Sequence, residues 1–106
     1  MGRFVTAAFR PKAGMQSQLE AVVEKHWRVL HAQHLVTDRP RYAMRAADGT
    51  VIEVFEWRSA EAIEQAHDNP AVHALWAEFA AVCDYIPLAA LDEAQQPFSE
   101  FTPLAI

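Results

Sequence analysis

Cysteine, long hydrophobic runs and signal sequences are scarce or missing in this chain. Its 106 residues include one cysteine, Cys83. A single cysteine excludes an intramolecular disulfide and fits a reducing compartment, so we expect a cytoplasmic protein. No stretch approaches the roughly 20 apolar residues that a membrane-spanning helix needs. The N-terminus lacks the basic and apolar regions of a signal peptide. The sequence therefore predicts no membrane partner.

Clustered positive charge is also missing. The 9 Lys and Arg residues are scattered among 14 Asp and Glu residues, and the net charge is −5. A nucleic-acid-binding protein would show a clustered basic face, so we expect no nucleic-acid partner. Apolar residues, in contrast, are abundant at 52% of the chain. This fraction is above that of a typical soluble domain and indicates that some apolar surface is buried against a partner.

Hydrophobic periodicity divides the chain into alternating strands and helices. Ser59 is a predicted helix N-cap, and Pro70 suits the first turn of a new helix but not a helix interior, so the second helical region should break between them. Asp48-Gly49 predicts a tight hairpin. We expect strands at residues 3–9, 41–47, 50–57 and 85–91, and helices at residues 15–35, 60–67 and 70–84.

This order, β-α-β-β-α-β, predicts an α+β fold of the ferredoxin-like type with an antiparallel four-stranded sheet. Residues 1–96 would form this one domain, and residues 97–106 an extended C-terminal tail. The helices can cover only one face of the sheet, yet the strands carry apolar residues on both faces. We therefore expect a homodimer whose two sheets stack face to face, with the tail packing on the partner subunit.

One set of residues resembles a known family over nearly the whole length of the chain. The residues lie at the end of the third strand and along the broken helix: Trp57, Ser59, Ala62, Ala66, His67, Asn69, Pro70, Leu75 and Phe79. In this pattern the chain resembles the antibiotic biosynthesis monooxygenase (ABM) family of the dimeric α/β-barrel superfamily. The resemblance implies a dimeric α/β barrel with an apolar pocket between the helices and the sheet of each subunit.

The resemblance also implies an activity. Cofactor-independent members deprotonate an acidic polycyclic phenol, whose carbanion then reacts directly with oxygen. We accordingly expect a monooxygenase, an oxidoreductase without a cofactor, that oxidises a small aromatic or polyketide-like substrate. Haem-degrading relatives are disfavoured, because the positions where they carry Asn, Trp and His hold Thr6, Ala66 and Trp76 here. Many relatives also have a second His after the Pro, where this chain has Ala71, with His73 two residues later.

The superfamily hosts several functions, so two alternatives stay open. One is a non-catalytic dimeric barrel that binds a small apolar ligand in a stress or regulatory role. The other is an isomerase that uses a histidine base without oxygen.

His67 is the candidate catalytic base. It lies beside the helix break, where it can reach the mouth of the pocket, and imidazole exchanges protons near neutral pH. The structural alternative is that its ring interacts with carbonyls at the helix end.

Other histidines and tryptophans are candidates for substrate binding. His26 and His34 share the inner stripe of the first helix, and tryptophan rings near the helix–sheet space can stack on a planar substrate. Each of these residues has a structural alternative as part of the core. The candidates are His26, Trp27, His34, Trp57, His73 and Trp76. His31 and His34 have metal-ligand spacing, but no Asp, Glu or Cys completes a set, so we predict no metal site.

Strand alternation leaves one question open. Tyr42 and Arg45 should face opposite sides of the sheet, as should Glu53 and Glu56. A carboxylate that faces a dry interior needs a partner. We expect Arg45 to pair with Glu53 or Glu56 in a structural ion pair.

Overall fold

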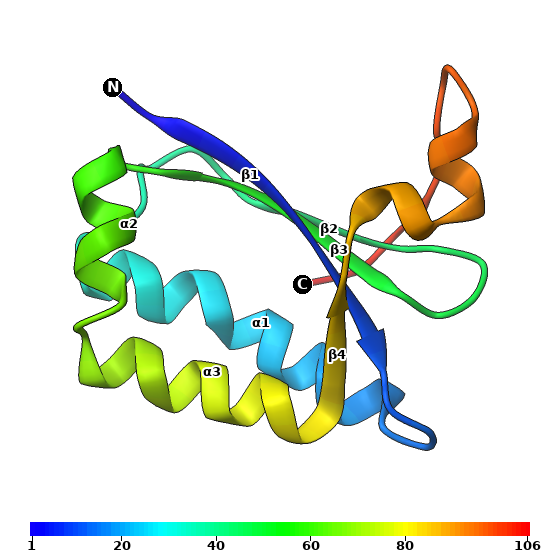
Figure 1. The fold of residues 1–106 in the computed structure, drawn as a ribbon, viewed down its shortest axis with the longest axis horizontal. Coiled ribbons are helices and arrows are strands. Elements are labelled where there is room, and N and C mark those ends of the chain that lie inside the picture. Colours follow the sequence, from blue (N-terminus) through cyan, green and yellow to red (C-terminus); the bar gives the residue numbers. More distant parts are fainter.

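The computed structural model describes residues 1–106 as an α+β fold with a five-stranded antiparallel sheet and three α-helices (Figure 1). The sheet has the strand order β4-β1-β3-β2-β5. The strands are β1 (Arg3–Pro11), β2 (Tyr42–Arg45), β3 (Val51–Trp57), β4 (Cys83–Ile86) and β5 (Thr102–Pro103). The helices are α1 (Gln16–Ala32), α2 (Ala60–Ala66) and α3 (Pro70–Val82).

Local capping explains the break between α2 and α3. The Ser59 hydroxyl accepts a hydrogen bond from the Ala62 N–H at 3.1 Å and starts α2. The Asn69 side chain accepts from the first backbone N–H groups of α3, and Pro70 occupies its first turn. Both caps satisfy donors that a helix start leaves unpaired. The predicted break in this helical region is therefore confirmed.

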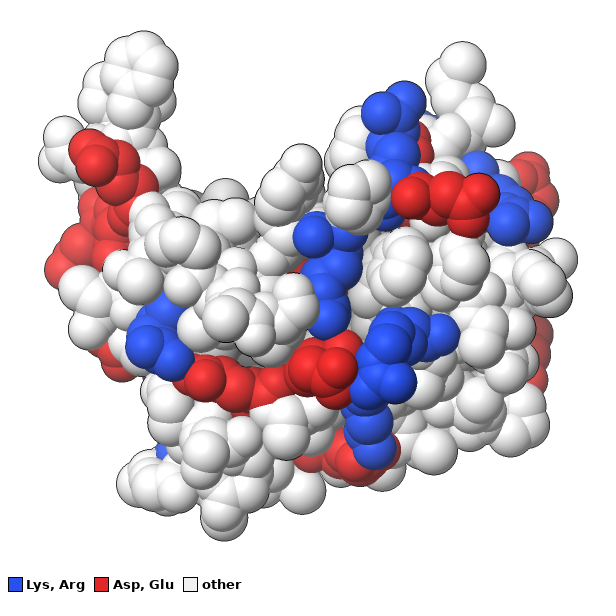
Figure 2. Space-filling model, turned by 180° about the vertical axis from the view of Figure 1, so that it is seen from behind, with Lys and Arg blue, Asp and Glu red and all other residues white.

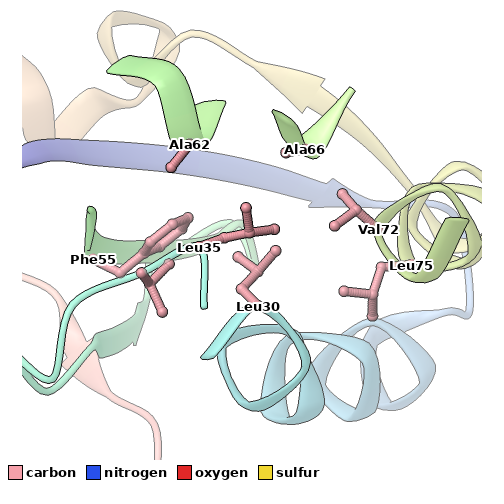
Figure 3. Packing of buried hydrophobic residues seen from close by; sticks show 8 residues of the cluster. Leu30, Leu35, Phe55, Ala62, Ala66, Val72 and Leu75 are labelled. Atoms are coloured by element: carbon pink, nitrogen blue, oxygen red, sulfur yellow. The ribbon is translucent and has the colours of Figure 1, made fainter. Parts of the chain in front are cut away.

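The three helices lie on one side of the sheet (Figure 1). β1 and β3 pair in register from Arg3 opposite Trp57 to Phe9 opposite Val51. Side chains of α1, α2, α3 and β3 point toward one another in the core between helices and sheet (Figure 3). The buried members of this cluster are Leu30, Leu35, Val36, Phe55, Ala62, Ala66, Val72 and Leu75.

The segment after β4 differs from the expected strand at residues 85–91. The strand ends at Ile86, and Leu88–Ala90 and Asp92–Gln95 form 3₁₀ turns instead. Pro87 cannot donate a ladder hydrogen bond, which is a reason for the strand to stop there. Leu91 then buries itself against Ala8 and Ile52 on the sheet face away from the helices. One end of that face is thus covered by the chain itself.

The C-terminal tail adds a fifth strand to its own sheet, where we expected four. Met44 pairs with Pro103, and Arg45 pairs with Thr102. Phe98 remains 88% exposed within the tail, and Phe4 and Tyr42 are 68% and 64% exposed. Packing of the tail on a partner subunit stays a prediction.

Charge is mixed over the molecule. On the face seen from behind, acidic and basic side chains alternate in a band across an otherwise uncharged surface, which is hollowed between two projections at its upper edge (Figure 2). None of the helices has the length and apolar character needed to cross a bilayer.

Candidate functional site

A cavity of about 420 Å³ lies between the sheet and the helices. Strands β1, β3 and β4 supply one wall, and α1, α3 and the residue after α2 supply the other. Its lining residues are Val5, Ala7, Phe9, His26, Phe55, Trp57, His67, Trp76, Phe79 and Tyr85. None of them is Lys, Arg, Asp or Glu, so the cavity favours an uncharged, largely apolar ligand.

Aromatic rings form much of the cavity wall. Phe9 of β1 stacks on Phe79 of α3, with ring centroids 4.5 Å apart and planes inclined by 16°. Phe55 and Trp57 of β3 meet edge to face at 5.4 Å. Apolar walls with ring faces suit a planar, apolar ligand.

His26 of α1 is the buried polar group of this wall, at 6% exposure. Its ring meets Phe55 and Phe79 edge to face at 5.5 and 4.9 Å. Its Nδ1 lies 2.6 Å from Oε1 of Glu53. A carboxylate can only accept, so the Nδ1 atom carries the proton of this bond, and in the neutral ring Nε2 is the acceptor. No hydrogen bond joins Nε2 to the rest of the protein.

Glu53 is fully buried on β3 and holds two partners. One carboxylate oxygen bonds His26, and the other lies 2.9 Å from Nη1 of Arg41. Arg41 is itself almost buried, and its guanidinium also donates to the backbone carbonyls of Val23 and Glu24 at 2.7 and 2.8 Å. The buried carboxylate is thus paired on both oxygens, as a charge inside a protein requires.

The expected ion pair of Arg45 with Glu53 or Glu56 is wrong. Arg45 bonds Glu20 of α1 at 2.6 Å. Glu56 points to the other side of the strand and pairs with Arg39 at 2.8 Å. Arg41 and Arg45 flank Ala43, the residue that pairs with Glu53 across the sheet, at two residues on either side. Arg41, just before β2, is the one that bonds Glu53, at 2.9 Å.

The structure brings four of the seven candidate site residues to the cavity: His26, Trp57, His67 and Trp76. The other three lie elsewhere. His34 follows the end of α1 in a left-handed backbone conformation, with φ of 60°, and is exposed. Because the helix ends before it, His34 no longer shares the inner stripe with His26. Trp27 stacks on His31 at 4.7 Å, and the exposed His73 contacts the His67 carbonyl.

His67 lies at the exposed margin of the cavity. Its ring meets Trp76 edge to face at 5.2 Å. No carboxylate or carbonyl orients its ring nitrogens, in contrast to His26 with its Glu53 partner. The environments of the two histidines therefore differ: His26 is buried and oriented by Glu53, whereas His67 is exposed.

Tyr85 of β4 was not among the candidates, although it lines the cavity. Burial raises the pKa of its phenol, and the neighbouring Cys83 raises it further. The hydroxyl is therefore a protonated donor near neutral pH. Phe9, Phe55 and Phe79 were not named as site residues either. The signals for them in the sequence are strand alternation, helix spacing and, for Phe79, the family pattern.

No group of three or more His, Cys, Asp or Glu side chains is placed to hold a metal ion. The chain matches no family model, and no curated protein or solved structure matches it either. The chemistry of this site is therefore argued from its own geometry.

Proposed function

We propose that the protein is a cofactor-independent monooxygenase that oxidises an uncharged aromatic or polyketide-like substrate in the cavity between helices and sheet. The observation that carries the proposal is His26, whose Nδ1–H is bound by the buried carboxylate of Glu53 at 2.6 Å. That bond leaves Nε2 as a proton acceptor in a cavity whose other walls are mostly apolar.

The reaction begins with proton transfer from an acidic hydroxyl or ring CH₂ of the substrate to Nε2 of His26. The resulting carbanion reduces dioxygen and forms a carbon–peroxide bond. Loss of water from the peroxide leaves a carbonyl, so that CH₂ and O₂ become C=O and H₂O. The substrate supplies all four electrons, and the proton on His26 leaves in the water. The apolar walls keep bulk water from quenching the carbanion.

His26 replaces His67 as the proposed base. A general base must keep its accepting nitrogen aimed at the substrate, and Glu53 provides that orientation for His26. His67 lies at the cavity margin near Trp76 and is assigned to substrate binding there.

The fold that we propose is ferredoxin-like, in a cytoplasmic homodimer of the α/β-barrel type. The strand order and antiparallel pairing support it. The part of the far sheet face that the C-terminal segment leaves open carries Phe4 and Tyr42, both largely exposed. Large apolar groups on an open sheet face favour burial against a second copy.

Oxygen uptake with a panel of hydroxyanthrones and hydroquinols tests the activity. His26→Gln removes the base without a large change in volume, and we expect kcat to fall by about 10²–10⁴-fold. His34→Gln is the matched control, because His34 follows the same helix but lies outside the cavity. Oxygen uptake that survives His26→Gln at the wild-type rate refutes the assignment.

The hydrogen-bonded pair of His26 and Glu53, the proposed catalytic dyad, also supports a histidine-based isomerase, which moves a proton without oxygen. Turnover that is undiminished under nitrogen would favour that reaction and contradict the monooxygenase. Binding of the panel without any turnover would favour the ligand-binding alternative.

A further inference from the structure

Arg41 is not among the residues that line the cavity, yet it contacts Glu53 of the proposed catalytic dyad His26–Glu53. Its Nη1 lies 2.9 Å from Glu53 Oε2, on the carboxylate oxygen that His26 does not use. Two backbone carbonyls of α1, those of Val23 and Glu24, accept its remaining hydrogen bonds. The guanidinium therefore joins the strand that carries Glu53 to the helix that carries His26.

The charge of this cluster depends on Arg41. With Arg41 and Glu53 both ionised, the buried group is neutral and His26 needs no proton on Nε2. Without Arg41, the fully buried carboxylate has only His26 as a partner. An isolated buried carboxylate is costly, so the cluster would take up a proton.

That proton can sit in two places, and both have the same consequence for the base. Either His26 becomes an imidazolium, or Glu53 becomes an acid that donates to Nδ1 and shifts the ring hydrogen to Nε2. In each case Nε2 carries a proton and cannot accept one from a substrate.

We infer that Arg41 is a positioning residue, which keeps Glu53 a charged acceptor and so holds His26 with Nε2 free toward the cavity. The inference rests on the proposed function for its role in turnover, but its effect on His26 exists without substrate. Arg41 acts through Glu53 and does not touch the ligand.

Other ionisable groups near the dyad are few. His67 and Tyr85 face the same cavity as His26. Arg45 and Glu20 form a separate pair between β2 and α1 at 2.6 Å, and neither bonds Glu53. Arg45→Gln is therefore a matched control for Arg41→Gln: it makes the same substitution at an arginine that also bonds α1, without touching His26 or Glu53.

The experiment is long-range ¹H–¹⁵N spectroscopy of the imidazole nitrogens in the full-length protein at pH 7, without ligand. In the wild type we expect His26 to carry its hydrogen on Nδ1, with Nε2 unprotonated. In Arg41→Gln the ratio of protonated to free Nε2 should rise by about tenfold or more. Arg45→Gln should resemble the wild type.

Arg41→Lys guards against a folding defect in the glutamine variant. It keeps the positive charge but loses the planar fork, so Nε2 should stay free. A proton on Nε2 in the wild type or in Arg41→Lys, or a free Nε2 in folded Arg41→Gln, overturns the inference.

Turnover separates this inference from the proposed function. If the monooxygenase is real, Arg41→Gln should lower kcat by about tenfold at pH 7 with KM little changed. The expected spectra without any turnover would support the inference while refuting the function. If Arg41→Gln has the spectrum and the turnover of the wild type, the inference is refuted while the proposed function stands.

Discussion

Substitution of Glu53 by glutamine tests whether the buried cluster of His26, Glu53 and Arg41 stabilises the fold. The amide keeps the size of the side chain and can still accept the Nδ1–H of His26. It removes the charge that faces Arg41, whose side chain is 10% exposed. Breaking a buried ion pair typically costs 3–5 kcal/mol. The carbonyls of Val23 and Glu24 still accept hydrogen bonds from Arg41, so we expect a loss at the low end of this range, about 3 kcal/mol.

Glu20→Gln is the matched control. Its pair with Arg45 is shorter, at 2.6 Å against 2.9 Å for Glu53 and Arg41, but the side chains are 25% and 40% exposed. Pairs of that kind contribute about 0–1 kcal/mol. The two variants thus compare the same chemical change in a buried and in a partly solvated pair.

Urea unfolding followed by tryptophan fluorescence measures both variants, at one fixed protomer concentration because association would shift the midpoint. The midpoint should fall with an unchanged slope. A loss of about 3 kcal/mol in a domain of this size lowers Tm by roughly 12–24 °C. If Glu53→Gln lowers the free energy of unfolding no more than Glu20→Gln does, the buried cluster of His26, Glu53 and Arg41 does not stabilise the fold.

Three further predictions concern the glycines, the core and the thiol. Gly49→Ala should lower Tm more than Gly14→Ala. Both glycines have a positive φ, but only at Gly49 would the new Cβ lie 2.7 Å from the Gln16 side chain. Equal losses of Tm would contradict this. Phe79→Ala should cost about 3–5 kcal/mol in urea unfolding, because the ring is 1% exposed; a loss under about 1 kcal/mol would refute its place in the core. Burial raises the pKa of Cys83 to about 11, with Asp84 adding to it, so the native thiol should react with a disulfide reagent at pH 8 far more slowly than the unfolded chain. As pH rises from the ordinary pKa of a thiol to the raised pKa of Cys83, the thiol of the unfolded chain loses its proton first, so the free energy of unfolding should fall. This fall should be smaller in Cys83→Ala.

Local signals in the sequence were sufficient for the order of the elements from β1 to β4, but not for β5. Ser59 and Pro70 act through hydrogen bonds and sterics within a few residues, and the N-cap and the first-turn proline that they predict are present. The end of the fourth strand was misplaced, because Leu91 leaves the strand to bury itself on the far sheet face. That gain depends on residues distant in the sequence.

The candidate site was predictable only in part. A cavity between helices and sheet follows from the resemblance, and His26, Trp57, His67 and Trp76 do line one. His34 was expected beside His26 because helical spacing was extended past the point where α1 ends.

The partner of His26 was decided by tertiary structure alone. The sequence determined that one of Glu53 and Glu56 must face inward, because side chains alternate along a strand. Which of them does so, and that it meets His26 and Arg41 instead of Arg45, depends on how β3 pairs with its neighbours and how α1 is rotated against the sheet. Those are contacts between segments far apart in the chain, and no short-range pattern records them.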